Sequence, residues 1–195
     1  GHFADQIMPE QIHILNVSFL VPTLRRDFGG CTGNIAYALR LLGGKPLPMA
    51  MLGNDGEGYV ARLKQLDIDT RFVQKLDDTY TAQCMITTDL DNNQITAFHP
   101  GAMMQAHLNK ITKDCGAAIA IVAPDGRDAM VQHAEQLHAA GIPFVFDPGQ
   151  GLPMFNGEEL RHFIAQAAWV TVNDYEGKML TERTGLSFAE ISQQV

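Results

Sequence analysis

The sequence predicts an α/β fold in which a mostly parallel sheet is covered by helices on both faces, giving three layers, with a small β-element beside it. Two observations predict this architecture. Short continuous apolar segments alternate with longer segments of helical periodicity, as expected for parallel strands joined by helices. One region instead shows the two-residue period of a β-hairpin with one solvated face.

The expected elements of the layered part follow one another along the chain. The segment DFGGCTGNIAYALRLLGG, residues 27–44, places two glycines before a short apolar helical pattern. A strand is expected at residues 46–52 and a helix at 55–66. Further strands are expected at 117–123, 143–147 and 169–172, and further helices at 126–141, 157–167 and 174–185.

The expected helix at 126–141 illustrates how these helices should pack. Its apolar residues Met130, Ala134 and Leu137 recur at helical spacing, so one stripe should lie on the sheet. His133 and His138 are five residues apart and do not share a face well. We expect both histidines to be solvated.

The β-element is expected to contain a hairpin. Residues 81–88 alternate between two faces, and the polar segment DLDNNQ then turns the chain back into a strand at 95–99. This polar segment lacks the glycine that a calcium loop needs at the corresponding position, so a turn is favoured. Residues 11–27 are also expected to be extended, with Pro22 limiting any strand there to a sheet edge.

Composition and charge narrow the classes of partner. The 195 residues contain 14 Lys and Arg against 22 Asp and Glu, a formal net charge of -8, and the longest basic run is the pair Arg25 and Arg26. A nucleic-acid or acidic-membrane binder would need a basic surface, so neither partner is expected. No apolar stretch reaches the length of a membrane span, and the first residues do not form a signal peptide. A small molecule is the expected partner.

The cysteines indicate a reducing compartment. Cys31, Cys84 and Cys115 are odd in number, widely spaced and without a CxxC motif. They therefore predict neither a disulfide framework nor a structural zinc site. A cytoplasmic location is expected.

Gly29, Gly30 and Asn34 form the first candidate site. A glycine pair before a helix allows close approach of a ligand to the backbone, where the free N–H groups of the first turn point outward. Asn34 can both donate and accept hydrogen bonds, which suits a polyhydroxy ligand. The other interpretation is that the glycines only make the turn and Asn34 caps its own helix.

Asn173 and Glu176 form the second candidate site. They follow an expected strand at the carboxyl edge of the sheet, where open α/β sheets bind ligands. Their oxygens could hold water molecules of a hydrated Mg²⁺ ion, or the two residues could form a capping box at the start of the next helix. Asp147, at the end of another strand, either contacts the same ligand or starts a turn. We expect the glycine pair and Asn34 to line one crevice with Asn173 and Glu176, so that all of them face a single bound molecule.

Two common nucleotide-binding motifs are missing from the sequence. There is no GxGxxG spacing for a dinucleotide loop and no Lys followed by Ser or Thr for a P-loop. A dinucleotide-dependent oxidoreductase of the same layered plan is therefore not favoured.

Four segments together resemble a known family. GGCTGNIAYALRLLGGKPLPMAMLGNDGEG, FHPGAM, FDPGQG and VNDYEGKML, in this order and spacing, are similar to the ribokinase superfamily, also called the PfkB carbohydrate kinases. The resemblance implies a ribokinase-like fold with a small β-lid over the acceptor. It implies that Asn173 and Glu176 organise the phosphate and Mg²⁺ without a direct metal ligand in this chain. It assigns the acceptor hydroxyls to Gly29, Gly30, Cys31 and Asn34.

The activity implied by this resemblance is ATP-dependent transfer of a phosphoryl group to a primary hydroxyl of a nucleoside or sugar. The chain looks most like bacterial adenosine kinases, and Thr32, where the general signature has a smaller residue, is compatible with them. A sugar kinase of the ribokinase or fructokinase type is the alternative acceptor class. A non-catalytic module that binds a nucleoside or sugar is the alternative from another class.

The resemblance also implies a division of the chain. Residues 1–30 and 78–100 correspond to the β-lid, through which a homodimer is expected to form, and residues 31–77 and 101–195 to a partial α/β core. The first core strand with its acceptor-binding Asp and the Gly-Ala-Gly-Asp segment of the family are not found in this sequence. We therefore expect an incomplete chain that contains no catalytic residue and is inactive as it stands.

Overall fold

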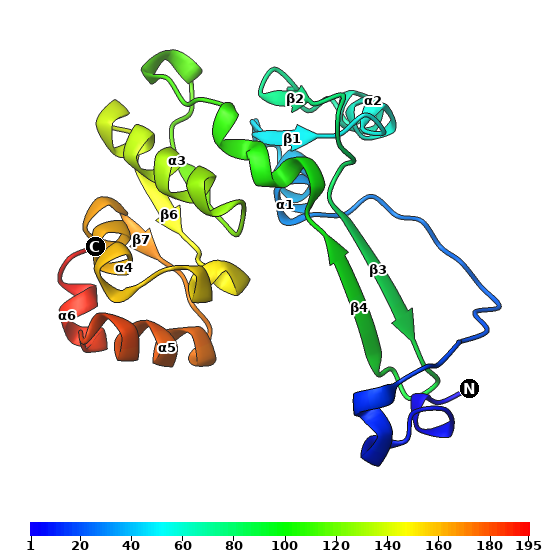
Figure 1. Ribbon diagram of the computed structural model, residues 1–195. Coiled ribbons are helices and arrows are strands. Elements are labelled where there is room, and N and C mark those ends of the chain that lie inside the picture. The colour runs from blue at the N-terminus through cyan, green and yellow to red at the C-terminus, as the bar shows by residue number, and fades with distance from the viewer.

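Three separate sheets form the strand framework of the computed structural model, which describes residues 1–195 (Figure 1). Two of the sheets are parallel and the third is an antiparallel hairpin. The parallel pair consists of β1 (Ala50–Leu52) and β2 (Val73–Lys75), the hairpin of β3 (Gln83–Thr88) and β4 (Gln94–His99), and the parallel three-stranded sheet of β5 (Ala120–Val122), β6 (Phe144–Phe146) and β7 (Trp169–Val170), in that order.

Six α-helices and five 3-10 helices accompany the strands. The α-helices are α1 (Cys31–Leu41), α2 (Glu57–Gln65), α3 (Arg127–Ala140), α4 (Gly157–Gln166), α5 (Asp174–Thr184) and α6 (Phe188–Ser192). The 3-10 helices are η1 (Phe3–Asp5), η2 (Pro9–Ile14), η3 (Gly101–Leu108), η4 (Lys113–Cys115) and η5 (Gly149–Met154). No helix combines the length and the hydropathy that a membrane span requires.

The α/β class and its parallel strands are confirmed, and every strand and helix expected in the layered part is present. The expected single continuous sheet is not found, because β1 pairs only with β2, and β5 pairs only with β6.

Helices do not cover both faces of the three-stranded sheet β5–β6–β7. Neighbouring strands place Ile121, Val145 and Trp169 in one row, and Ile121 and Trp169 are 48 % and 50 % exposed.

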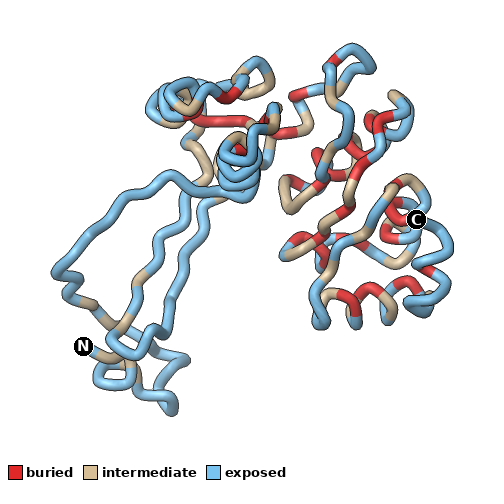
Figure 2. The backbone as a smooth tube through the Cα atoms, turned by 180° about the vertical axis from the view of Figure 1, so that it is seen from behind, coloured by how far each residue is buried: buried red, intermediate tan, exposed pale blue.

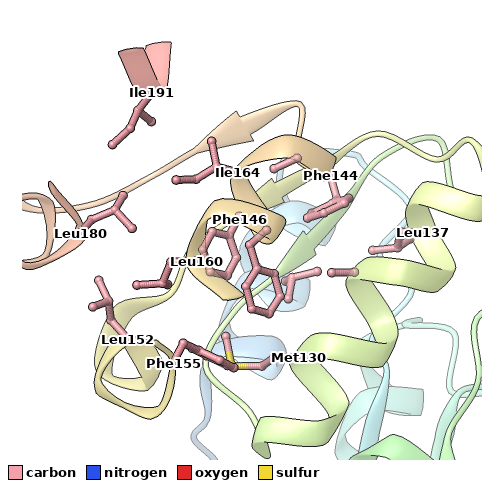
Figure 3. Packing of buried hydrophobic residues seen from close by; sticks show 14 of the residues in the cluster. Met130, Leu137, Phe144, Phe146, Leu152, Phe155, Leu160, Ile164, Leu180 and Ile191 are labelled. Atoms are coloured by element: carbon pink, nitrogen blue, oxygen red, sulfur yellow. The ribbon is translucent and has the colours of Figure 1, made fainter. Parts of the chain in front are cut away.

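The main hydrophobic core lies on the other face of the three-stranded sheet, under α3 and α4 (Figure 3). Phe144 and Phe146 alternate with Val145 along β6, so both rings point to this face, and both are completely buried. The Phe146 ring stacks on the Phe163 ring of α4 with 4.4 Å between the centroids. Phe155 packs edge-on against Phe163.

Helix α3 packs on the sheet by the expected stripe. Met130, Ala134 and Leu137 are all buried. The expectation for His133 is wrong, because its ring is buried as well and its Nε2 lies 2.9 Å from the carbonyl oxygen of Asn109. One hydrogen bond to the backbone is what allows the imidazole to leave water. His138 is exposed, as expected.

The 3-10 helix η3 joins the two parallel sheets and their helices. It contacts β1 on one side and α3 on the other. Ala102 and Ala106 of η3 form a buried cluster with Met51 of β1 and Ala129 of α3. These small side chains let the backbones approach closely, so η3 sets how the two parts of the molecule are placed.

The hairpin β3–β4 leaves this body and extends away from it (Figure 1). Its turn is confirmed: Asp89 accepts hydrogen bonds from the N–H groups of Asp91 and Asn93. The expected burial of one face is not found, because every residue of β4, and every residue of β3 except Thr87, is exposed (Figure 2).

The first residues of the chain lie at the tip of the hairpin, and the chain then returns to the body as an arc separate from the hairpin (Figure 1). The expectation of an extended segment from residue 11 is wrong at its start, because Pro9 opens a 3-10 helix that ends at Ile14. Proline fixes a backbone angle that suits the first turn of a helix. Near the hairpin tip, the N–H of Phe3 donates to Asp89, and His2 Nδ1 lies 2.8 Å from Asp91.

The aromatic core predicts a large and local effect of truncation. Phe146→Ala should lower the free energy of unfolding by about 3–5 kcal/mol, because it removes a buried ring and leaves a cavity. Phe98→Ala is the matched control on the hairpin, where the ring is 54 % exposed, and should change stability by no more than about 0.5 kcal/mol. Chemical denaturation measures both, and equal effects would contradict the placement of the core.

Candidate functional site

The glycine pair forms the entrance to α1. Gly30 is the N-cap residue and has a φ of 91°, which favours glycine. Gly29 has no positive φ, and a Cβ placed on it would have no atom within 4 Å. Neither backbone strain nor packing within this chain therefore explains the glycine at position 29. The space beside it is open to a ligand.

Asn34 lies in the first turn of α1 and is exposed. Its backbone N–H donates to the Gly30 carbonyl, but no side chain caps the helix. The interpretation of Asn34 as a cap of its own helix is therefore wrong, and the side-chain amide is free to bind a ligand. The Cys31 thiol, one turn earlier, is free and exposed.

Tyr59 of α2 fixes the glycine segment, a contact that the sequence analysis missed. Its hydroxyl donates a hydrogen bond of 2.6 Å to the carbonyl oxygen of Gly29, and Phe28 packs edge-on against its ring. A Cβ at Gly33 would overlap this hydroxyl, so the glycine makes room for the tyrosine. Burial raises the pKa of Tyr59, which keeps the hydroxyl protonated as a donor.

A cavity of about 260 Å³ lies beside this contact, between α1 and α2. Asn34 and Tyr37 line it from α1, and Tyr59 and Arg62 line it from α2. The cavity joins aromatic faces, an amide and a guanidinium group. This combination suits a planar, hydrogen-bonding ligand.

Asn173 and Glu176 form the capping box that was one of the two sequence-based interpretations. Asn173 Oδ1 accepts from the Glu176 N–H at 2.9 Å, and Glu176 Oε2 accepts from the Asn173 N–H at 3.0 Å. One oxygen of Glu176 and the Asn173 amide nitrogen make no hydrogen bond within the protein. The capping box therefore does not exclude a ligand at the same two residues.

Asp147 faces the same edge of the three-stranded sheet. Burial raises the pKa of the Asp147 carboxyl, and the negative charge of Glu176 raises it further. Two carboxyl groups that repel one another at the carboxyl ends of neighbouring strands are stabilised by a cation between or beside them. This charge arrangement fits the oxygen ligands that Mg²⁺ prefers.

Asp125 is a candidate that the sequence analysis did not single out. It follows β5, as Asp147 follows β6, and burial raises its pKa to about 6 despite the hydrogen bond from the Gly126 N–H. Perturbed carboxyl groups at a sheet edge are often functional. The sequence could have indicated Asp125 by its position, because the segment PDG directly follows an apolar strand.

The two candidate sites do not share a crevice in this structure. The start of α1 and the start of α5 lie apart in both views (Figures 1 and 2). The cavity beside Asn34 is not lined by Asn173 or Glu176. The expected common crevice is thus not found, because the sheets that carry the two sites are not paired. A larger cavity, about 540 Å³, lies between α3 and α4 and contains none of the expected site residues.

Comparison with known proteins places the chain in a family. Residues 1–195 match the model of the pfkB family carbohydrate kinases. The curated nucleoside kinase of Methanocaldococcus jannaschii is 29 % identical over 164 residues, which are 83 % of this chain and 53 % of the relative. The chain thus spans about half the length of this relative.

Solved structures support the same fold. The nucleoside kinase of Burkholderia thailandensis in complex with inosine is 57 % identical with a TM-score of 0.86, and the alignment covers 92 % of this chain and 60 % of that one. The crystal structure of the Methanocaldococcus jannaschii nucleoside kinase, described as an archaeal member of the ribokinase family, is 26 % identical with a TM-score of 0.85, covering 93 % and 60 %. The ribokinase-like fold is confirmed.

The contact between Tyr59 and Gly33 predicts a measurable coupling. Gly33→Ala should destabilise the protein because its methyl group overlaps the Tyr59 hydroxyl, and the cost should be smaller in the Tyr59→Phe background. Residues in contact typically couple by about 0.5–3 kcal/mol. Thermal unfolding of the two single variants and of the double variant measures this coupling free energy. Strict additivity would show that the hydroxyl does not occupy the space beside Gly33.

Proposed function

The chain belongs to the pfkB family of carbohydrate kinases, and on this basis we propose that the whole protein is a nucleoside kinase that transfers the γ-phosphoryl group of ATP to the primary hydroxyl of its acceptor. The observation that carries the proposal is the 57 % identity to the Burkholderia thailandensis nucleoside kinase, whose solved structure contains inosine. A purine nucleoside such as inosine or adenosine is therefore the proposed acceptor.

The acceptor is proposed to lie against Gly29, Gly30, Cys31 and Asn34. The open space at Gly29 lets a ribose ring approach the backbone, and the free amide of Asn34 can donate to one hydroxyl and accept from another. The hydrogen bond from Tyr59 holds the Gly29 carbonyl in place. Fixing the acceptor in this way lowers the entropic part of the reaction barrier.

Asn173 and Glu176 are proposed to organise Mg²⁺ and its water molecules on the phosphate side. The repulsion between Glu176 and Asp147 supports this role, because a divalent cation neutralises it. ATP, the donor implied by the family, supplies the phosphoryl group. In this proposal the residues of this chain orient the acceptor and would hold the cation whose positive charge offsets that of the phosphate. Positioning and charge stabilisation are most of what phosphoryl transfer requires from a protein.

The hairpin β3–β4 is proposed to cover the acceptor and to exclude water, so that the phosphoryl group reaches the acceptor and is not hydrolysed. Its apolar side chains Met85, Ile86, Ile95 and Phe98 are exposed and available for such a cover. The homodimer expected through the hairpin stays a prediction.

The acceptor class is tested by a coupled ADP-release assay of the whole protein. Inosine and adenosine should be phosphorylated with kcat/KM at least about a hundredfold above ribose and fructose, because a base in a pocket adds several kcal/mol of binding. A preference for the free sugars would favour a sugar kinase. Calorimetric binding of inosine without turnover in the presence of MgATP would favour a non-catalytic binding module.

The role of Glu176 is tested by Glu176→Gln. Glutamine retains the capping box but removes the negative charge, so the fold should persist while kcat at saturating acceptor falls about tenfold or more. Glu190→Gln is the matched control, because Glu190 forms the same capping box with Ser187 on α6. A loss of kcat in both variants, or in neither, would contradict a specific role for Glu176. Titration with Mg²⁺ should show a raised half-saturating concentration for Glu176→Gln alone.

A further inference from the structure

The hairpin β3–β4 is held by few contacts. Its strands are exposed on both faces, and an isolated two-stranded hairpin is only marginally stable in water. Away from its tip, where it meets the first residues of the chain, its direction is set at its root, residues 79–83. The residues that fix this root therefore decide where the whole hairpin points.

The backbone of Tyr80 is enclosed at the root by two glycines from different segments. A Cβ at Gly53, after β1, would overlap the backbone of Tyr80 and Thr81, and a Cβ at Gly101, after β4, would overlap the Tyr80 carbonyl oxygen. The N–H of Ala102 donates to this same carbonyl. The root thus lies in a backbone contact that admits no side chain on either side.

Asp55 contributes two hydrogen bonds to the root of the hairpin. One carboxylate oxygen accepts a hydrogen bond of 2.8 Å from the Thr81 N–H, and the other accepts one of 2.9 Å from the side-chain amide of Gln83. The Gly53 N–H donates in turn to the Thr81 hydroxyl. Asp55 therefore holds the segment that begins the hairpin at two points, two residues apart. The hydrogen bond from Thr81 lowers the pKa of Asp55, and the charge of Arg26 lowers it further.

Asp55 lies just before α2, where a carboxylate could instead stabilise the dipole of that helix. Helix α2 begins at Glu57 and has no side-chain cap. The Asp55 carboxylate uses both of its oxygens on the hairpin instead. Arg26, whose charge acts on Asp55, lies three residues before Gly29.

We propose that Asp55 is a positioning residue that fixes the direction of the hairpin through Thr81 and Gln83, and thereby places the hairpin over an acceptor bound at the glycine pair. The effect on the acceptor rests on the proposed function. The anchoring of the hairpin does not, because it follows from the hydrogen bonds and the glycine contacts alone.

The test reverses the donor and acceptor side chains at positions 55 and 83 in the whole protein. Asp55→Asn replaces the charged acceptor of Thr81 and Gln83 by a neutral amide, and Gln83→Glu sets two carboxylates against each other. In each single variant the backbone amide hydrogens of the hairpin, residues 83–99, should exchange with solvent about tenfold faster. The reason is that a hydrogen bond to a charged group is lost.

In the double variant the amide introduced at position 55 can donate to the carboxylate introduced at position 83. The exchange rates of the hairpin should therefore return to within about threefold of those of the unaltered protein, since one hydrogen bond to a charged group is restored. Gln94→Glu is the matched control, because it places the same new charge on the hairpin away from Asp55.

The kinetic arm separates this proposal from the proposed function. In the assay with inosine, KM should rise in both single variants and recover in the double variant, with a smaller change in kcat. Hairpin exchange that is unaltered in the single variants, or that is not restored in the double variant, would overturn the anchoring. Altered exchange with an unchanged KM would overturn the positioning role. A whole protein that phosphorylates no acceptor would overturn the proposed function while the exchange measurements still decide the anchoring.

Discussion

The contact of η3 with β1 and α3 is the constraint on which the arrangement of the molecule depends. Ala102 and Ala106 fit between Met51 and Ala129, and all four side chains are buried. β1 leads directly into the loop that holds the root of the hairpin, and α3 starts just after the perturbed carboxyl group of Asp125. The position of the hairpin relative to the edge of the three-stranded sheet therefore depends on the packing of these four side chains. A larger residue among them would separate the part that contains β1 from the part that contains α3.

Most elements of the fold could be predicted because each carries its own local signal. Apolar strands and helical stripes depend on neighbouring residues only, and so do the ends of helices. The strand β2 was missed because VQK is short and polar and is a strand only by pairing with β1. Helix α6 was missed although Ser187 and Glu190 form a capping box, since five residues are too few for periodicity. How the strands group into sheets depends on long-range contacts that no local pattern carries.

The residues proposed to face a ligand could be singled out from the sequence, but the contacts that support them could not. Asn173 and Glu176 show why the sequence left two interpretations open, since one spacing serves both a capping box and an ion site, and the structure satisfies the first without excluding the second. The support of Gly29 by Tyr59 joins α1 to α2 across thirty residues and arises only from how the two helices pack. The same holds for Asp55, whose partners lie 26 and 28 residues further along the chain.

The glycines of the motif region separate into two kinds once their surroundings are known. At Gly33, Gly53 and Gly101 a specific atom of the chain occupies the space that a Cβ would need, so packing within the chain favours a glycine there. At Gly29 and Gly58 that space is empty and φ is not positive. Neither packing nor a left-handed backbone angle within the chain requires a glycine at these two positions. Of the two, only Gly29 lies at the entrance to α1, so its open space is the one available to the acceptor proposed there.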